Sequence, residues 1–302
     1  MTTATDTPRT TSPAPPRAAV ARTRRRRRPR AVALDAGLYV GLVLAVLVMS
    51  VPLIWMVLAS FKTNAELANL PLQWLPEAFL PDNYQRVAEA IPIGRMFLNS
   101  LGVTLIGAGL KVFLGLCCAY AVVFVDVPFR NAAFVIVIFA LLIPGQITII
   151  PNYTLVAELG WLNTYHGIVV PGLASAFGTF LFRQHFRSLP VSVLEAAELD
   201  GAGHWRRLWR FVVPMSTPTI AAVTLVSLVN DWNEYLWPML VTDNTRTMTL
   251  PVGLTLLQDI DGMQNWGVLM AATVVVTLPM LIFFLVLQRR LVAGLTAGAV
   301  TG

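Results

Sequence analysis

The side chains that could perform catalysis are few and scattered along this chain of 302 residues. The two lysines, Lys62 and Lys111, follow Phe61 and Leu110, so the GxxxxGK sequence that binds nucleotide phosphates does not occur. Neither a GxSxG nucleophile motif nor an HExxH zinc motif occurs, and no His/Cys cluster has the spacing of a metal site. We therefore expect no enzymatic activity, no cofactor and no bound metal. Any ATP that powers this protein must be hydrolysed by another chain.

The densest run of polar and aromatic groups is DWNEYLWP at residues 231–238, which lies among apolar segments. Polar groups in such a place are costly unless they face water, a partner helix or a ligand. We predict that Asn233 and Glu234 belong to a substrate path, because each could pair with a sugar hydroxyl. Trp232, Trp237 and Pro238 are assigned a structural role at the end of a helix.

A second group of aromatic and amide side chains lies between residues 152 and 166. Such side chains suit sugars, whose C–H faces stack on rings and whose hydroxyls need donors and acceptors. We therefore add Asn152 and Tyr153 to the candidate substrate path. An aromatic belt at a membrane interface explains the same residues without a ligand, and this alternative stays open.

The stretch from residue 191 to 214 carries charge between long apolar runs. We predict a short helix, opened by a capping box of Ser192 and Glu195 and ended by positive φ angles at Gly201 and Gly203. The following residues predict an amphipathic helix lying in a membrane interface. Its apolar face would hold Trp205, Leu208, Trp209 and Val212, and its polar face Arg206, Arg207 and Arg210.

This stretch resembles the EAA loop of ABC importer permeases: EAA occupies 195–197, Gly201 follows, and Val213 precedes Pro214. Two positions depart from the family pattern, because Phe211 and Val213 replace the usual aliphatic residue and leucine. NSL at 99–101, AYA at 119–121, DWNEYLWP and QRRLVAGLTAGAV at 288–300 are similar to the carbohydrate-transporting branch. The arginine that usually follows AYA in that branch is missing.

The resemblance implies an all-α membrane protein with the type I permease fold, six transmembrane helices and a cytoplasmic EAA coupling loop at 184–211. It implies alternating-access import of a mono- or oligosaccharide or related polyol. The implied partners are a second homologous permease, two ATP-binding subunits and an extracytoplasmic sugar-binding protein. An ion-coupled secondary transporter is the alternative. By resemblance, the residues that couple the permease to the ATPase are Glu195, Ala196, Ala197, Asp200 and Gly201.

Composition independently indicates a membrane protein, because 56% of the residues are hydrophobic and only 13% are charged. Nine arginines before residue 31 supply the excess positive charge. We predict a disordered tail over 1–35 and a permease domain over 36–302. A spanning segment follows the basic run at 22–30, so a topology signal that contacts membrane lipid is favoured over a nucleic-acid-binding arm.

Six uncharged runs are long enough to cross a bilayer as helices. They lie near residues 37–60, 97–122, 132–151, 164–183, 212–232 and 267–287. Lys111 is the only ion in the middle of any of them, and Pro171, Gly172 and Gly178 predict a kinked or broken fourth span.

Arginines concentrate in the tail and in alternate connections, which the positive-inside rule places in the cytoplasm. This rule predicts that both termini and the EAA loop lie inside, and the resemblance implies a multi-pass protein of a bacterial plasma membrane.

Overall fold

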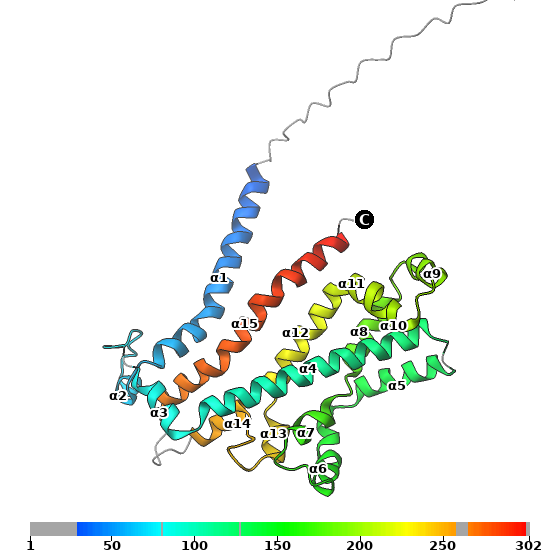
Figure 1. The fold of residues 1–302 in the computed structure, drawn as a ribbon. Coiled ribbons are helices and arrows are strands. Elements are labelled where there is room, and N and C mark those ends of the chain that lie inside the picture. Colours follow the sequence, from blue (N-terminus) through cyan, green and yellow to red (C-terminus); the bar gives the residue numbers. More distant parts are fainter. Residues whose placement is uncertain (1–28, 80, 127, 258–264, 300–302) are drawn as a thin grey trace, which may run out of the picture. The chain divides into compact units, whose positions relative to one another are not determined.

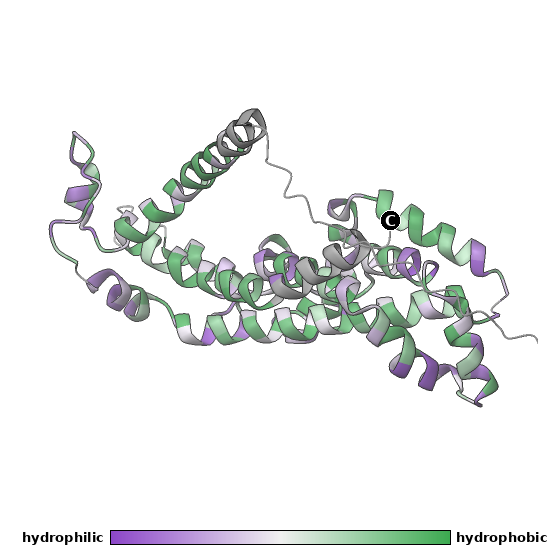
Figure 2. Cartoon of the chain, turned by 90° about the horizontal axis from the view of Figure 1, so that it is seen from above, coloured by the Kyte–Doolittle hydropathy of each residue, from purple (hydrophilic) through white to green (hydrophobic). Residues whose placement is uncertain are grey.

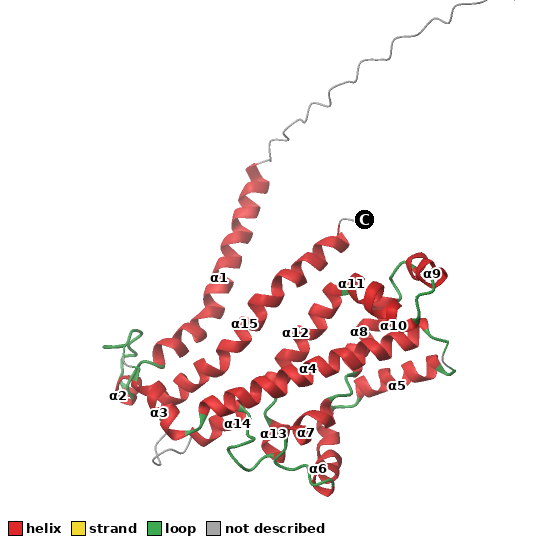
Figure 3. Cartoon of the chain, viewed as in Figure 1, coloured by secondary structure: helices red, strands yellow, loops and turns green. Residues whose placement is uncertain are grey.

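The computed structural model describes residues 29–79, 81–126, 128–257 and 265–299, and every element of regular structure in these residues is a helix (Figures 1 and 3). The α-helices and the intervening 3-10 and π segments, labelled η, are α1 (Pro29–Ala59), α2 (Asn64–Ala68), α3 (Asp82–Ala90), α4 (Ile93–Phe124), α5 (Arg130–Leu142), η1 (Gly145–Thr148), α6 (Ile149–Glu158), α7 (Tyr165–Val169), η2 (Val170–Gly172), α8 (Ala176–Phe186), α9 (Val191–Leu199), α10 (His204–Arg207), η3 (Leu208–Val212), α11 (Val213–Met215), α12 (Thr217–Asn233), α13 (Leu236–Val241), α14 (Leu250–Gly253), η4 (Leu254–Leu257) and α15 (Trp266–Ala299).

The chain forms two compact units, residues 1–51 and 52–302. Most of the disordered tail predicted over 1–35 lies outside the described residues, but helix α1 already begins at Pro29, before the predicted boundary. The cavity and the EAA loop described below belong to the second unit. Hydrophobic residues cover most of its long helices, and hydrophilic residues gather in short helices and connections (Figure 2).

Among the described residues, three helical stretches are long and apolar enough to cross a membrane: Gly37–Ala59, Ile93–Phe124 and Trp266–Val286. The number rises to six if each of three bent helix pairs counts as one span. The bend of 45° between Gly172 and Ala176 confirms the prediction that the fourth span is kinked or broken.

The prediction of one continuous helix over 132–151 is wrong. Helix α5 ends at Leu142, and the segment from Gly145 to Glu158 continues at 95° to it. The cause lies in Pro144, which forces Ile143 into an extended conformation with ψ of 118° and cannot itself donate a helical hydrogen bond. The fifth span differs similarly, because α12 begins only at Thr217 and the segment from His204 to Met215 meets it at 84°.

Two hydrophobic clusters hold opposite halves of α4. We call the first the loop core, since it joins the C-terminal half of α4 and α8 to the charged loop. It consists of Val112, Leu116, Ala119, Tyr120, Phe182, Phe186, Leu189, Leu194, Leu208, Val212 and Val223. The second cluster packs α15 against α3 and the N-terminal end of α4, around Val87, Ile91, Met96, Trp232, Leu250, Leu257, Val268, Ala271 and Ala272.

Polar contacts order the connection between α1 and α3. The Lys62 ammonium, fully buried, donates to the carbonyl of Gln73 and lies over the Trp55 ring. Glu66 accepts from the backbone N–H of Glu77 at 2.8 Å and from that of Thr63 at 2.7 Å. These bonds stabilise the carboxylate and hold the pKa of Glu66 below its ordinary value.

Candidate functional site

A cavity of about 360 Å³ lies where α4, the bent segment η1–α6, η2 and the end of α12 meet. The bend at Pro144 places Gln146, Thr148 and Asn152 in its wall, which a straight third span would not do. The lining mixes hydroxyl, amide, charged and aromatic side chains, and so it can pair with the hydroxyls of a polar ligand. The lining residues used below are Gly107, Lys111, Gln146, Asn152, Gly172, Asp231, Trp232, Glu234, Trp237, Thr104, Thr148, Ser100 and Thr249.

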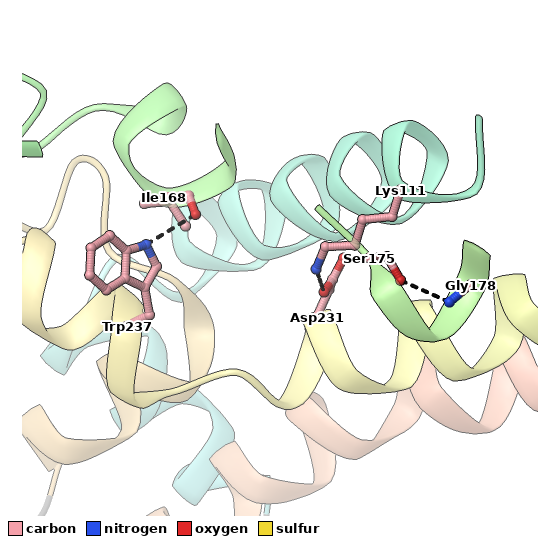
Figure 4. A network of polar contacts seen from close by, with 6 residues as sticks. All are labelled: Lys111, Ile168, Ser175, Gly178, Asp231 and Trp237. Atoms are coloured by element: carbon pink, nitrogen blue, oxygen red, sulfur yellow. Dashed lines mark hydrogen bonds and ion pairs between the residues drawn. The ribbon is translucent and has the colours of Figure 1, made fainter. Parts of the chain in front are cut away.

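The two ions at the centre of this wall are paired with each other. Figure 4 shows Lys111 of α4 pointing at Asp231 of α12, and the ammonium donates to Asp231 Oδ1. Both side chains are mostly shielded, with 19% and 11% exposed. A Cβ at Gly107 would come within 3.0 Å of Asp231 Oδ2, so the glycine makes room for the carboxylate. The sequence-based view of Lys111 as a lone ion is therefore corrected, because α12 packs beside α4 and supplies Asp231 as the partner of the lysine.

Three buried polar atoms of this wall have no hydrogen-bond partner among the described residues. They are Thr104 Oγ1, Thr249 Oγ1 and Asp231 Oδ2. Buried polar groups are paired in most proteins, since an unpaired one costs about 1–3 kcal/mol. The three residues line the cavity, but these atoms have almost no exposed surface. A side chain must therefore turn toward the cavity before a ligand hydroxyl or water can pair with them.

The structure separates the four predicted substrate-path residues into two pairs. Glu234 and Asn152 line the cavity. Asn233 does not line it, because its amide turns back along α12 and donates to the Val229 carbonyl at 2.8 Å. Tyr153 also lies outside the lining, one position further along α6 than Asn152, where the helical rotation points it to another face.

Two tryptophans of the same run fix the cavity wall. Trp232 is buried, and its indole N–H donates to the Val276 carbonyl of α15 at 2.9 Å. The indole N–H of Trp237 lies 3.2 Å from the carbonyl of Ile168 at the end of α7, as Figure 4 shows. The hydrogen bonds place each indole between helices, which agrees with the structural role assigned from sequence, while both rings also line the cavity.

The EAA stretch forms a helix that ends in a glycine turn. Gly201 has φ of +74°, the left-handed conformation predicted for it. The N–H of Ala202 donates to the Ala197 carbonyl and that of Gly201 to the Glu198 carbonyl, both at 2.9 Å. This pair of bonds is the Schellman motif, which satisfies the last carbonyls of a helix. Gly203 instead has φ of −65° and precedes α10, so the prediction of a positive φ there is wrong.

Helix α9 presents one face outward and is held by the other. Glu195, Ala196, Asp200 and Gly201 are exposed, whereas Leu194 and Ala197 are buried against the rest of the chain. Ala197 is buried, and its carbonyl accepts the hydrogen bond that closes the glycine turn. Its place among the coupling residues stays a prediction. The outward apolar side chains include Val193 and Leu199, the latter 89% exposed.

An ion pair and the loop core fasten α9 to the long helices. Arg207 of α10 donates to Glu198 of α9 at 2.7 Å and approaches His204 Nδ1 at 2.9 Å. Leu194 of α9 packs in the loop core with residues of α4 and α8. The exposed face of α9 is thus backed by side chains of these two helices.

Three details of the loop differ from the sequence-based predictions. Helix α9 starts at Val191 after Pro190, so Ser192 lies inside it and makes no capping box with Glu195. Arg207 is buried rather than solvated. Leu208 and Val212 are buried in the loop core, while Trp205 and Trp209 pack around Phe113 of α4. The segment is therefore not a single amphipathic helix, because η3 has the wider π geometry that splits this face.

The site residues that sequence reasoning missed are Gln146, Thr104 and Thr249, together with the pairing of Lys111 with Asp231. Pro144 was the available signal for the first, since it predicts a break in the third span. The threonines gave no signal. Thr104 lies in an apolar segment, where a hydroxyl can bond to its own helix, and Thr249 lies in the polar connection that precedes α14.

Comparison with known proteins identifies the chain's relatives. Residues 111–297 match the family model described as "Binding-protein-dependent transport system inner membrane component". The chain is 30% identical over 262 residues to the sn-glycerol-3-phosphate transport system permease protein UgpE of Brucella abortus (strain 2308), with 84% of this chain and 93% of that protein covered. It is 32% identical over 269 residues to UgpE of Yersinia pestis bv. Antiqua (strain Antiqua), with 87% and 96% covered.

Two solved structures share the fold. A chain of a bacterial ABC transporter involved in the import of the acidic polysaccharide alginate aligns with a TM-score of 0.74 and 23% identity, covering 86% of this chain and 96% of that one. A chain of a bacterial alginate ABC transporter in complex with an alginate pentasaccharide-bound periplasmic protein aligns with a TM-score of 0.59 and 16% identity, covering 86% and 94%.

Proposed function

Because this chain belongs to the family of binding-protein-dependent transport system inner membrane components, we propose that it passes a sugar or related polyol into the cytoplasm by alternating access. It is an all-helical inner-membrane permease of an ABC transporter and not itself the catalytic subunit. Family membership removes the ion-coupled secondary transporter as an alternative. The names of the relatives, which refer to glycerol 3-phosphate and alginate, support a sugar-related cargo.

In this proposal the chain crosses the membrane six times, with the three bent pairs each acting as one span and both termini in the cytoplasm. It works with a second homologous permease, two ATP-binding subunits and an extracytoplasmic binding protein. The positive-inside distribution of arginines supports this orientation.

The observation that carries the proposal is the construction of α9. Its outer face exposes Glu195, Ala196 and Leu199, and its inner face is fixed to α4 and α8 by Leu194. We assign Glu195, Ala196 and Asp200 to the contact with an ATP-binding subunit, and Gly201 to the turn that holds α9 in place. When the ATP-binding subunits close, α9 moves and carries α4, and with it Lys111 and the cavity wall.

The glycine turn gives the test. Gly201→Val has open space around its new side chain, so its cost is the backbone strain of a β-branched residue at positive φ, on the order of 1–3 kcal/mol. We expect ATP-driven uptake to fall about tenfold in the complex co-expressed with the products of the neighbouring genes, while the variant still inserts in the membrane.

Two control variants separate the effect of backbone strain at Gly201 from the effect of a larger side chain. Gly203→Val also meets open space, but at φ of −65°, and should transport normally. Gly201→Asn should retain most activity, since asparagine tolerates the left-handed conformation. Normal uptake by a well-expressed Gly201→Val variant would contradict the proposed coupling.

A further inference from the structure

We propose that the cavity of this chain accepts an uncharged polyhydroxyl compound and disfavours phosphorylated or carboxylated ones. This inference rests on the proposed function, because it concerns the cargo of the same cavity. It starts from the charges in the lining. Lys111, Asp231 and Glu234 are the only charged residues that line the cavity among the described residues, so two carboxylates face one ammonium.

The ammonium is already neutralised. Lys111 donates to Asp231, and Gly107 leaves room for that carboxylate against α4. Gly172 lies beside the lysine, where a Cβ would make an ordinary contact 3.7 Å from Nζ. The close approach at Gly107 thus accommodates the carboxylate, and the Lys111 ammonium meets Asp231 rather than an incoming anion.

An anionic ligand could use Lys111 only by displacing Asp231. The displaced carboxylate would then be buried without a cation, which is far more costly than leaving the pair intact. The anion would also approach Glu234, whose Oε1 accepts from the Trp237 backbone N–H at 3.2 Å and which forms no ion pair among the described residues. Both effects act against phosphate and carboxylate groups.

The remaining polar lining suits hydroxyl groups. Ser100, Thr104, Thr148 and Thr249 carry hydroxyls, and Gln146 and Asn152 carry amides. Thr104 Oγ1, Thr249 Oγ1 and Asp231 Oδ2 have no partner in the described chain. A polyol hydroxyl donates one hydrogen bond and accepts others, so once these buried side chains turn toward the cavity it can satisfy both the acceptor on Asp231 and the threonine hydroxyls. An ionised phosphate or carboxylate group can only accept hydrogen bonds, so that group cannot pair with the Asp231 carboxylate.

The test measures binding to the purified complex of this permease with its partner permease and ATP-binding subunits in nanodiscs, by isothermal titration calorimetry. In two matched pairs of probes one member carries an anionic group that the other lacks: sorbitol with sorbitol 6-phosphate, and maltitol with maltobionate. We expect the uncharged member of at least one pair to bind at least tenfold more tightly. Glu234→Gln should reduce that preference about tenfold, the effect of one charge at roughly 10 Å and an effective dielectric constant of about 20.

Matched variants separate this effect from general damage. Glu158→Gln removes one exposed carboxylate from α6 outside the cavity and should leave the preference unchanged. Thr249→Val should weaken binding of the uncharged probe about fivefold, and Thr249→Ser should restore it. Tighter binding of the anionic members, an unchanged preference in Glu234→Gln, or binding of no probe overturns the inference. Stimulation of ATP hydrolysis by the binding protein, measured in the same preparation, tests the proposed function separately.

Discussion

At the scale of single residues, the pair formed by Lys111 and Asp231 joins α4 to α12 through side chains that are largely shielded from solvent. Removing one partner of such a pair leaves an uncompensated charge, which typically costs about 3–5 kcal/mol. Replacing both partners by neutral side chains of similar size costs much less. Stability should therefore depend on keeping both charges or on removing both.

We expect Lys111→Met to destabilise the purified complex strongly, because Asp231 would remain charged without a partner. The double variant Lys111→Met, Asp231→Asn should recover most of the loss. Thermal unfolding followed by tryptophan fluorescence measures both. A single variant as stable as the wild type, or a double variant no better than the single one, would show that the two groups are not energetically coupled.

The sequence could predict one member of this pair as unusual but not the contact. A lysine in the middle of an apolar run signals a buried cation, and Asp231 stands near the end of another run. Only the packing of α4 against α12 brings them together, over a separation of 120 residues. The same limit applies to Asn233 and Glu234, which are adjacent in sequence but face opposite ways: the position where α12 ends decides which of them reaches the cavity.

At the scale of elements, the N-terminus of α15 lies against the connection that follows α1. The amide of Asn83 donates to the carbonyls of Ser60 at 2.9 Å and Lys62 at 2.8 Å. A Cβ at Gly267 would lie 2.5 Å from the Lys62 carbonyl oxygen and 2.6 Å from the Asn83 amide nitrogen. The missing side chain of Gly267 therefore allows α15 to pack directly on backbone.

Gly267→Ala should push α15 away from this connection and break the Asn83 hydrogen bonds, at a cost of about 1–3 kcal/mol typical of overpacking. The matched variant Gly109→Ala meets nothing within 4 Å on α4, and it should be neutral or slightly stabilising because alanine favours helix more than glycine. Unfolding temperatures of the two variants should therefore shift in opposite directions or by clearly different amounts. Equal shifts would contradict the close packing at Gly267.

The helices themselves were largely predictable, and their bends could have been predicted more fully. Proline and glycine at 171 and 172 led to a correct prediction of a broken fourth span. The same reasoning applied to Pro144 would have predicted the bend after α5, which places Gln146, Thr148 and Asn152 in the cavity wall. The capping box was assigned to Ser192 and Glu195, but the structure forms one at Thr63 and Glu66, where an extended residue precedes the helix. Helix α9 also follows an extended residue, but that residue is Pro190, which has no side-chain acceptor. Propensity cannot choose between such sites, because the position of the first helical turn decides which residue occupies the N-cap.

At the scale of the whole molecule, the distribution of arginines determines the expected orientation. Connections assigned to the cytoplasm contain most of the arginines that follow the tail, whereas the opposite connections contain few and hold most of the acidic residues. Both the loop core and the exposed face of α9 lie on the arginine-rich side. An experiment that determines the orientation of the chain therefore also tests whether α9 can contact an ATP-binding subunit in the cytoplasm.

In a variant with Cys117 and Cys118 replaced by alanine, a cysteine at exposed Ser188 should react only with reagents that enter the cytoplasm. A cysteine at exposed Thr245 is the matched control on the opposite side, and it should react with an impermeant thiol reagent in intact cells. If the impermeant reagent labels Ser188→Cys but not Thr245→Cys in intact cells, the orientation is the reverse of the one proposed, and the EAA loop cannot contact an ATP-binding subunit in the cytoplasm.

The bend after Leu142 also concerns the lipid around the protein. Helix α5 has 13 residues, so it rises only about 20 Å, against a hydrocarbon thickness of about 30 Å. Its side chains at Ile136, Phe139 and Leu142 are exposed and apolar. A short apolar helix draws the bilayer thinner at its surface, at a modest free-energy cost for each ångström of mismatch. Lipids with short acyl chains should therefore gather beside α5, and the thickness of the host membrane becomes one of the conditions that set the transport rate.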